Sequence, residues 1–300
     1  MSHPPLGPAL PLSVATLGIA TFAGMDVLMK LLAIEIGAYN AMLWRTLLAL
    51  IIATVLFLWS RGRWPEKSVF RLHVWRGVVT SAMAFLFFWG LIYVPLAEAV
   101  GLSFIAPLLA LYLAAVFLKE SVGSKAVWAS VIGLAGAVVI IGGKLGGEYS
   151  EAIGRGIAAI LLSALLYAYN LILQRRQAVV AKPVEIVFFQ NATVVTVYLL
   201  FFPLLAVTPG SELLPYLIAS AALAVVSSLL LSWAYARAEA RILIPVEYTA
   251  FVWAALFGWL VFGEEITTAT LLGTVLIVVG CLMTANQKPE RMEHIETTAI

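Results

Sequence analysis

The chain has 300 residues, of which 63% are hydrophobic and only 11% are charged, and its mean hydropathy is +1.02. A soluble domain carries roughly 25–35% charged residues on its surface, so this composition excludes a soluble fold and requires lipid to cover much of the exterior. The formal net charge of +2 offers no concentrated basic face, so nucleic acid is not an expected partner.

Apolar stretches of about 20 residues, the length that a membrane-spanning helix needs, recur along the whole chain. In order they lie at 12–33, 39–60, 73–94, 97–118, 126–142, 153–177, 183–204, 212–236, 242–262 and 268–285. They predict an all-α polytopic membrane protein with ten transmembrane helices. The short tail before them lacks the Lys or Arg residues of a cleavable signal peptide.

The distribution of Lys and Arg predicts how the protein lies in the membrane. With ten spans, both tails and the even-numbered connections share one side, and that side holds 14 of the 18 basic residues. Cytoplasmic loops carry an excess of Lys and Arg, so we expect both termini to be cytoplasmic. The expected location is the inner membrane or plasma membrane, as a multi-pass protein.

The two halves of the chain resemble each other at an offset of 144 residues. The aligned pairs are Asp26 with Asn170, Lys30 with Gln174, Glu120 with Glu264, Gly136 with Gly280 and, at an offset of 145, Arg45 with Gln190. Each half holds five spans, an odd number, so the second repeat is inverted relative to the first. Inverted repeats are the ground plan of many secondary transporters.

The limits of the ten spans and of the two repeats predict the domain organisation. We expect an N-terminal tail at 1–11, a first five-helix repeat at 12–142, an outer connection at 143–152, a second five-helix repeat at 153–285 and a C-terminal cytoplasmic tail at 286–300.

The segment after the ninth span carries a recognisable signature. It begins at Glu264 and continues with Thr267, Gly273, Leu276, Ile277 and Gly280. In the first half Glu120 and Gly136 match this signature, but Ala129 stands where glycine is usual. With Lys30 near the end of the first span, these residues resemble the drug/metabolite transporter superfamily, specifically its EamA-type branch, over almost the whole chain.

The resemblance, which is closest to aromatic amino acid exporters of the YddG type, implies a central cavity between two inverted repeats. It also implies alternating access and export of small amphipathic metabolites, foremost aromatic and other neutral amino acids. The alternative substrates are a nucleotide sugar or an organic phosphate, for which more basic residues at mid-membrane would be expected. A non-transport membrane protein or an intramembrane enzyme is the alternative of a different class.

The sequence offers few residues that could support an enzymatic function. Cys281 is the only cysteine, and the histidines His3, His73 and His294 lie near a terminus or in a connection. No intramembrane cluster of metal ligands or nucleophile–base pair is evident. We therefore expect no catalytic residue, no metal and no cofactor. The expected partners are a small-molecule substrate and the lipid bilayer, with the protein a monomer or homodimer.

Ionisable groups inside apolar spans are costly and are therefore functional candidates. Asp26 and Lys30 are four residues apart on one helix face, and Arg45 enters the second span from the same side, so we expect a charge-paired cluster of the three. A purely structural tie between the first two helices is the alternative. Glu98 and Glu247, at the starts of the fourth and ninth spans, are candidates for proton exchange, or else solvated carboxylates favoured by a helix dipole.

Two prolines and a set of mid-depth side chains complete the candidates. Pro107 and Pro245 interrupt the fourth and ninth spans, and the kinks that proline produces are expected hinges or fixed bends. An amphipathic substrate needs apolar walls with a few polar groups. The candidate cavity residues are Phe22, Met25, Ser81, Phe85, Ser103, Ser163, Tyr167, Ser227, Ser228, Tyr248, Thr249 and Trp253. Each of these side chains could instead serve helix packing alone.

A stripe of small residues predicts one close helix contact. Ala129, Gly133 and Ala137 recur every four residues, with Gly136 alongside. Small residues let the backbones of membrane helices approach closely. We expect this face to pack against the tenth span, with a homodimer contact as the alternative.

Overall fold

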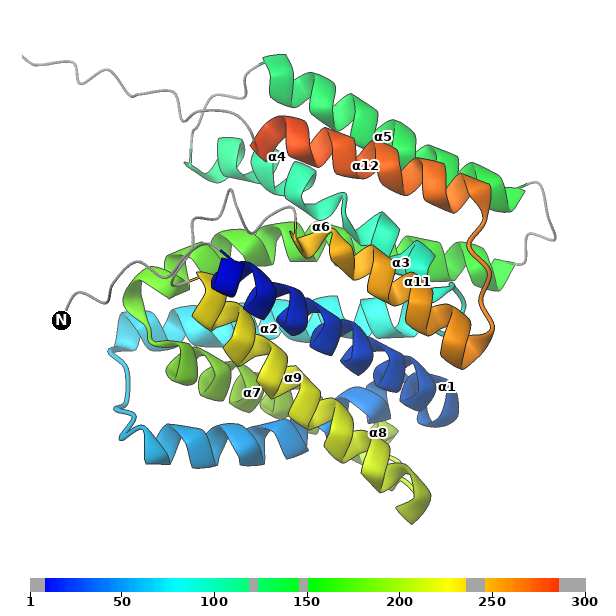
Figure 1. The fold of residues 1–300 in the computed structure, drawn as a ribbon. Coiled ribbons are helices and arrows are strands. Elements are labelled where there is room, and N and C mark those ends of the chain that lie inside the picture. Colours follow the sequence, from blue (N-terminus) through cyan, green and yellow to red (C-terminus); the bar gives the residue numbers. More distant parts are fainter. Residues whose placement is uncertain (1–8, 119–123, 146–150, 236–245, 286–300) are drawn as a thin grey trace, which may run out of the picture.

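The computed structural model describes residues 9–118, 124–145, 151–235 and 246–285. Within these ranges the regular elements are α-helices and one short 3-10 helix, with no strand. In a hydrocarbon environment a helix satisfies its backbone hydrogen bonds within its own segment, which explains why apolar runs of this length fold in this way. The all-α prediction is confirmed. The helices lie side by side and run roughly along one direction (Figure 1).

The first helix, α1, extends over Ala9–Trp59 but consists of two helices joined at Gly37, whose φ of 77° and ψ of 151° are not helical. A positive φ favours glycine. The two halves run in opposite directions along helix α9 (Leu214–Tyr235). In the first half Gly18 lies beside Leu231 and Gly24 beside Leu223, so the first half runs antiparallel to α9, whereas the second half runs parallel to it. Gly37 thus separates the first two predicted spans.

The remaining helices follow the predicted stretches closely. They are α2 (Lys67–Gly90), α3 (Leu96–Ser103), α4 (Ala106–Leu118), α5 (Ser124–Leu145), α6 (Glu151–Val180), α7 (Pro183–Leu199), α8 (Phe202–Leu205), η1 (Ser211–Leu213), α9, α11 (Thr249–Phe262) and α12 (Thr268–Ala285). The start of α2 differs most from the prediction, because its first polar turn lies before the apolar run. His73 therefore lies inside a helix rather than in a connection.

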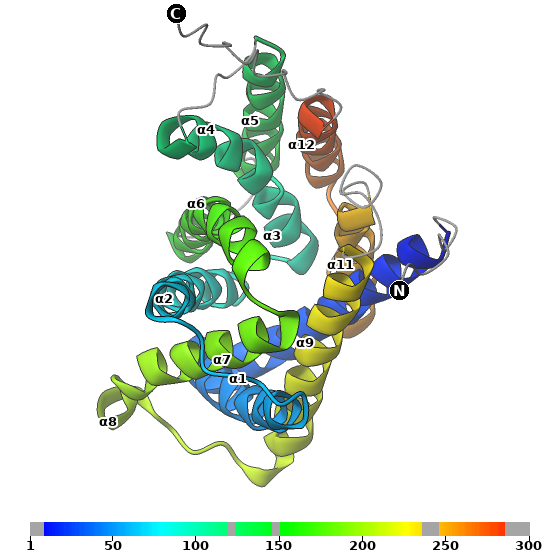
Figure 2. The same ribbon diagram turned by 90° about the vertical axis from the view of Figure 1, so that its left-hand side faces the viewer.

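Helix limits recur at the predicted offset. Ser124 begins α5 and Thr268 begins α12, 144 residues later, and Lys67 and Ser211 are related in the same way. The packing recurs as well, since α6 contacts α2 and α4 as α1 contacts α9 and α11. In Figure 2 helices α2 and α6 are seen nearly end-on, and α5 and α12 lie at the same edge of the bundle. Each half of the chain therefore packs its first helix against the other half.

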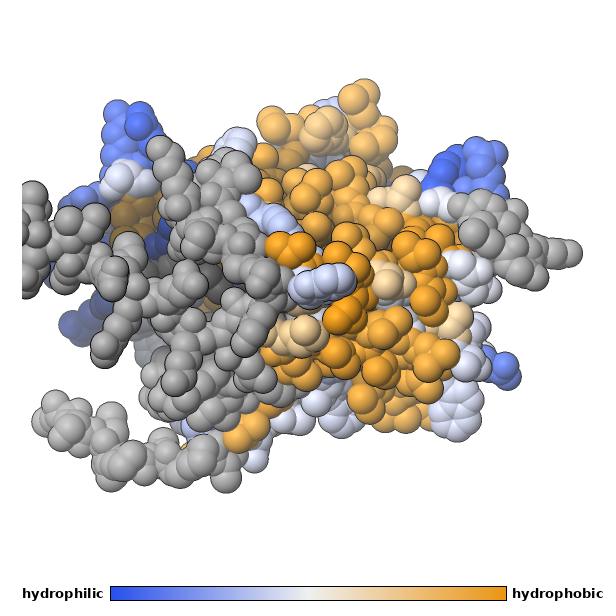
Figure 3. Space-filling model, turned by 90° about the horizontal axis from the view of Figure 1, so that it is seen from above, coloured by the Kyte–Doolittle hydropathy of each residue, from blue (hydrophilic) through white to orange (hydrophobic). Residues whose placement is uncertain are grey.

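The connections alternate between the two ends of the bundle. The Gly37 end holds the Gly37 bend and the connections 91–95, 206–210 and 263–267, at the right of Figure 1; the Trp64 end holds the connections 60–66 and 181–182. Between the ends lies a broad apolar surface, with hydrophilic residues toward both sides (Figure 3). This distribution is the one expected of a protein embedded in a bilayer.

By length and composition, four helical segments of the described chain are apolar enough to cross a membrane. They are Leu10–Trp59, Lys67–Gly90, Glu151–Gln174 and Ser211–Leu231. Five further apolar helices are shorter, among them Val127–Gly143 and Thr249–Phe262. The first of the four segments contains the Gly37 bend, so it is long enough for two passages.

The predicted interruption of the fourth span is present. Helix α3 ends at Ser103 and α4 begins at Ala106, so the break lies at Phe104–Ile105, just before Pro107. Pro107 lies in the first turn of α4. Backbone N–H groups there have no partner within the helix, so the N–H group that proline lacks costs no helix hydrogen bond. Pro245, the second predicted hinge, lies outside the described residues.

The closest helix contact joins α5 and α12. Gly136 faces the carbonyl group of Gly273, and a Cβ atom on Gly280 would lie 2.5 Å from the carbonyl oxygen of Ala129. The predicted packing of the small-residue face against the tenth span is therefore confirmed.

The substitution Gly280→Val should destabilise this contact, because a side chain there meets the backbone of α5. We expect a loss of about 1–3 kcal/mol, the usual range for overpacking, measured as a lower thermal unfolding temperature in detergent. Gly142→Val on α5 is the matched control, since no atom lies within 4 Å of the Cβ it would add. Equal effects of the two substitutions would contradict the proposed close contact.

Candidate functional site

A buried ion pair holds the Gly37 end together. The Lys30 ammonium group donates to the carbonyl oxygen of Val94 at 2.9 Å and to the Glu264 carboxylate. The second oxygen of Glu264 accepts the N–H of Leu96, the first residue of α3, at 2.7 Å. The ring of Phe262 lies 5.0 Å from the same ammonium group. One lysine thus joins α1, the turn between α2 and α3, and the connection between α11 and α12.

Two glycines place the Glu264 carboxylate in this contact. Gly263 ends α11 with a φ of 65°, a left-handed conformation that glycine adopts without strain. Gly258 leaves room for the carboxylate, since a Cβ atom there would lie 2.7 Å from Glu264 Oε2. The turn after α11 therefore directs Glu264 back into the bundle.

A second carboxylate lies beside the same lysine. Glu98, in the first turn of α3, is only 2% exposed and accepts a hydrogen bond of 3.1 Å from the Thr270 hydroxyl. Its charge attracts Lys30. The alternative of a solvated carboxylate is therefore wrong for Glu98, which is buried between helices. We call Lys30, Glu98, Glu264 and Thr270 the Lys30 cluster.

The expected three-residue cluster of Asp26, Lys30 and Arg45 does not form. Lys30 turns toward the end of the bundle and pairs with Glu264, whereas Asp26, one turn earlier, lies deeper. The i,i+4 spacing does place the two residues on neighbouring turns, but Glu264 and the Val94 carbonyl satisfy the ammonium group better than a single carboxylate would.

Asp26 and Arg45 lie together at mid-depth, without an ion pair. From the Gly37 bend they are about 16 Å and about 12 Å down their helices at 1.5 Å per residue, near the middle of a hydrocarbon core about 30 Å thick. Their charges attract each other. Yet Oδ1 of Asp26, a residue 5% exposed, and Nε of Arg45 have no hydrogen-bond partner among the described residues.

The remaining contacts of Arg45 are weak and local. Its Nη2 atom lies 3.4 Å from the Thr46 hydroxyl and 3.7 Å from the Met42 sulfur, both on its own helix. Tyr198 of α7 is close enough to interact with the guanidinium electrostatically. The Tyr198 hydroxyl donates instead to the Ser81 carbonyl at 3.0 Å. We call Asp26 and Arg45 the mid-depth pair.

A polar network at the Trp64 end was missed by the sequence analysis. Arg76 donates to Asn170 at 3.1 Å and to Gln177, which also contacts His73; His73 in turn contacts Glu185 at 3.0 Å. The network joins α2, α6 and α7. The signal for it was helical spacing, because residues 73, 76 and 80 share one face of α2 and residues 170, 174 and 177 share one face of α6.

Most hydroxyl groups of the predicted cavity serve the backbone. The hydroxyls of Ser81, Ser103, Ser228 and Thr249 donate to carbonyl groups within their own helices or helix starts, whereas Ser163 donates to Met83 and Ser227 to Gly18 across helix contacts. These bonds match the helix-packing alternative, although each oxygen can still accept a further bond.

The apolar members of the predicted cavity do not form one wall. Phe22 is 44% exposed, whereas Met25 is buried. Trp253 packs against the small cluster that contains Ala234, and its ring lies 5.9 Å from that of Phe257. Phe257, like Phe85, Tyr167 and Tyr248, packs against the main core. Glu247 interacts electrostatically with Tyr167.

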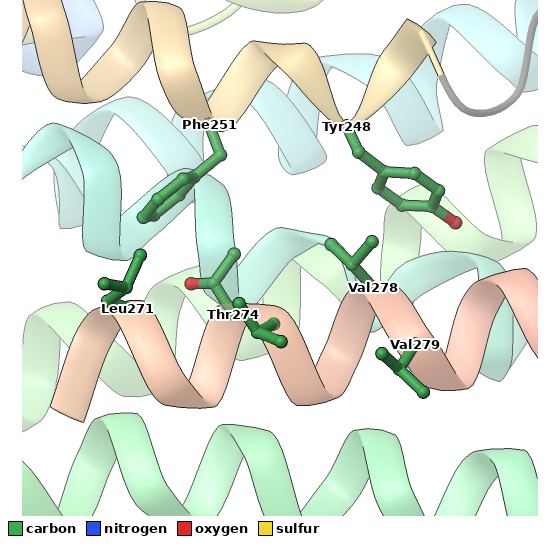
Figure 4. Close-up of a pocket in the computed structure, with 7 residues that line it drawn as sticks. Tyr248, Phe251, Leu271, Thr274, Val278 and Val279 are labelled. Carbon is green, nitrogen blue, oxygen red and sulfur yellow. The ribbon is translucent and has the colours of Figure 1, made fainter. Parts of the chain in front are cut away.

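A hollow of about 210 Å³ lies between α11 and α12. Tyr248 and Phe251 of α11 point toward Thr274 and Val278 of α12 (Figure 4). Leu271, Val275 and Val279, which also line it, are exposed on the apolar surface of the bundle. The hollow therefore opens toward lipid, and of the predicted cavity residues it contains only Tyr248.

Comparison with known proteins finds one family model and several relatives along nearly the whole chain. The model of the EamA-like transporter family matches residues 10–142 and 154–286. One solved crystal structure superposes with a TM-score of 0.59 at 23% identity, covering 91% of this chain and 96% of the other. That likeness supports the fold.

The curated relatives are transporters. The chain is 26% identical to the pseudopaline exporter of Pseudomonas aeruginosa, over 92% of this chain and 95% of that protein. It is 24% identical to the riboflavin transporter of Brucella anthropi, over 81% and 86% of the two chains. It is 22% identical to the S-adenosylmethionine uptake transporter of Rickettsia felis, over 93% of each.

The substitution Glu264→Gln should destabilise the protein markedly, because it leaves the Lys30 ammonium group buried without its main partner. Breaking a buried pair in this way costs about 3–5 kcal/mol, and unfolding in detergent measures the loss. In the double variant Lys30→Gln/Glu264→Gln part of that stability should return. Glu265→Gln, next door and exposed, is the control. Additive losses in the double variant would show that the two side chains are not coupled.

Proposed function

The chain belongs to the EamA-like transporter family, and we propose that it is a secondary exporter working by alternating access. The substrates proposed are small amphipathic metabolites, foremost aromatic and other neutral amino acids. Its curated relatives carry metabolites across membranes in either direction, and the pseudopaline exporter among them supports the outward direction. The earlier likeness to aromatic amino acid exporters of the YddG type supports the substrate class.

The observation that carries the mechanism is the Lys30 cluster. Lys30 comes from the first half of the chain and Glu264 from the second, so their ion pair spans the two halves at one end of the bundle. Alternating access needs contacts of this kind, which close one end and must separate before the substrate can leave there. A buried ion pair suits the role, because its hydrogen bonds are made or broken as a unit.

The membrane topology proposed has ten spans in two inverted repeats, 12–142 and 153–285. It counts the two halves of α1 separately and takes α3 with α4 as one span. The recurrence of helix limits at an offset of 144 residues supports it. The excess of Lys and Arg on the side of the termini supports an orientation with the Trp64 end in the cytoplasm and the Gly37 end outside. Since one chain holds both repeats, we propose that a monomer suffices for transport.

The proposed substrate class rests on the mid-depth residues. A carboxylate and a guanidinium lie there among apolar and aromatic side chains such as Met25 and Tyr198. A neutral amino acid offers two opposite charges and an apolar side chain to such surroundings. Nucleotide sugars and organic phosphates, the alternative, carry negative charge that the single Arg45 would have to balance against Asp26.

Counterflow in proteoliposomes is the direct test of this function. Vesicles loaded with unlabelled tryptophan should accumulate external labelled tryptophan saturably, and phenylalanine, tyrosine and leucine should compete. Riboflavin, S-adenosylmethionine and glutamate complete the panel, each tested with and without a pH gradient. Movement of riboflavin or S-adenosylmethionine alone would contradict the proposed amino acid substrates while leaving the transporter assignment intact.

Opening of the Gly37 end should follow from loss of the Lys30 cluster. With Cys281 replaced by alanine, a cysteine at the buried position Met25 reports access to mid-depth. In intact cells, Lys30→Gln should raise its labelling by an external membrane-impermeant thiol reagent at least about tenfold, since tenfold needs only 1.4 kcal/mol.

Inside-out vesicles supply the second half of the accessibility test. There the same Lys30→Gln variant should label more slowly, because a shift toward the outward-open state depletes the inward-open one. Arg155→Gln, at an exposed position on the same end, is the control. A rise in labelling from both sides would indicate general loosening and contradict alternating access.

A further inference from the structure

The mid-depth pair has a feature that helix packing does not explain. Asp26 and Arg45 stand on the two halves of α1, close enough to attract each other, yet not within the 4.0 Å of an ion pair. Uncompensated buried charges cost several kcal/mol each, and most buried polar groups have a hydrogen-bond partner. A tie between the two helices would bring the charges into contact.

The equivalent position in the second half shows what a structural role looks like. Asn170, the counterpart of Asp26, accepts hydrogen bonds from Arg76 at 3.1 Å and from Thr80 at 3.3 Å. These bonds tie α6 to α2. Asp26 has an acceptor oxygen at the corresponding place in α1, but no donor among the described residues reaches it. Asp26 Oδ1 thus differs from its counterpart in Asn170, because no neighbouring helix of the described chain supplies it with a donor.

The chemistry of the two side chains defines the kind of ligand that suits them. A carboxylate binds an ammonium group, and a guanidinium offers a planar set of donors that matches a carboxylate. Two opposite charges that attract but do not touch are both satisfied by one molecule that is positive at one end and negative at the other. An α-amino acid carries its ammonium and carboxylate groups on a single carbon atom.

We propose that Asp26 and Arg45 together bind the charged backbone of an amino acid substrate, Asp26 its ammonium group and Arg45 its carboxylate. This assignment rests on the proposed export of amino acids and names the residues that recognise both charged ends. The buried Met25, beside Asp26, and Met42, beside Arg45, then offer apolar contacts to the rest of the molecule. Methionine side chains adapt to apolar groups of different shape.

The test is a binding experiment with three indole compounds that differ only in their charged groups. Labelled L-tryptophan is bound to the protein in nanodiscs and displaced by tryptophan, by tryptamine, which lacks the carboxylate, and by indole-3-propionate, which lacks the ammonium. The wild-type protein should prefer tryptophan to each analogue by at least about tenfold, the effect of one charged hydrogen bond of about 1.5 kcal/mol or more.

Two variants separate the roles of the pair. Asp26→Asn should erase the preference for tryptophan over indole-3-propionate and keep the preference for tryptophan over tryptamine. Arg45→Gln should erase the preference over tryptamine and keep the preference over indole-3-propionate. Asn170 and Gln190 occupy the equivalent positions in the second half, so the fold already carries these amides. The matched controls are Glu151→Gln and Arg155→Gln, which neutralise an exposed acid–arginine pair and should leave both preferences unchanged.

Each outcome decides between the proposals. Equal binding of all three compounds by the wild-type protein, or equal weakening of all three by both variants, overturns the assignment while leaving export intact. Tryptophan that binds with the expected preferences but is not transported supports the assignment and overturns the export proposal. Absence of binding by tryptophan, phenylalanine and leucine alike overturns both. If a variant does not fold, equal binding of the three compounds by the wild-type protein still overturns the assignment.

Discussion

Lipid offers no hydrogen bonds, and the polar groups inside this bundle must therefore find partners within the chain. The Lys30 cluster is the place where this constraint acts most strongly. One ammonium group faces two carboxylates, a backbone carbonyl and an aromatic ring. Those partners come from the connection between α2 and α3, from the connection between α11 and α12, and from the helices α3 and α11 themselves. The positions of three segments therefore depend on satisfying this one charge: α3, the turn after α11 and the end of the first half of α1.

The two halves of the chain share helix limits but not polar chemistry. At the Gly37 end Lys30 pairs with Glu264, whereas at the Trp64 end Arg76 is held by the neutral amides Asn170 and Gln177, and His73 contacts Glu185. Aromatic rings reinforce the latter, with Phe57 stacked on Phe188 at 4.5 Å and Trp64 edge-on to Phe189 at 5.1 Å. The two halves therefore share a backbone arrangement, but different polar contacts hold the two ends of the bundle together.

The sequence was sufficient for the helices because apolar run length and glycine position act locally. The gap between the first two spans, the break near Pro107 and the small face of α5 were all predicted in this way. The charge contacts were not, since Glu264 lies 234 residues from Lys30 and no local spacing reports such a pairing. The i,i+4 rule pointed to Asp26 instead. His73 was expected in a connection because hydropathy does not register the polar first turn of α2, which lengthens that helix beyond its apolar run.

The backbone contact between α5 and α12 has a consequence for how the halves can move. Gly136, Gly273 and Gly280 bring main chain against main chain, and the side chains of Ile140 and Ile277 pack against two of these glycines. Sliding would drive Cα atoms into carbonyl groups, whereas a small rotation about the seam keeps them in contact. Since α5 closes one half and α12 the other, the seam is a pivot. Under the proposed alternating access, opening at one end of the bundle would then be mechanically tied to closing at the opposite end.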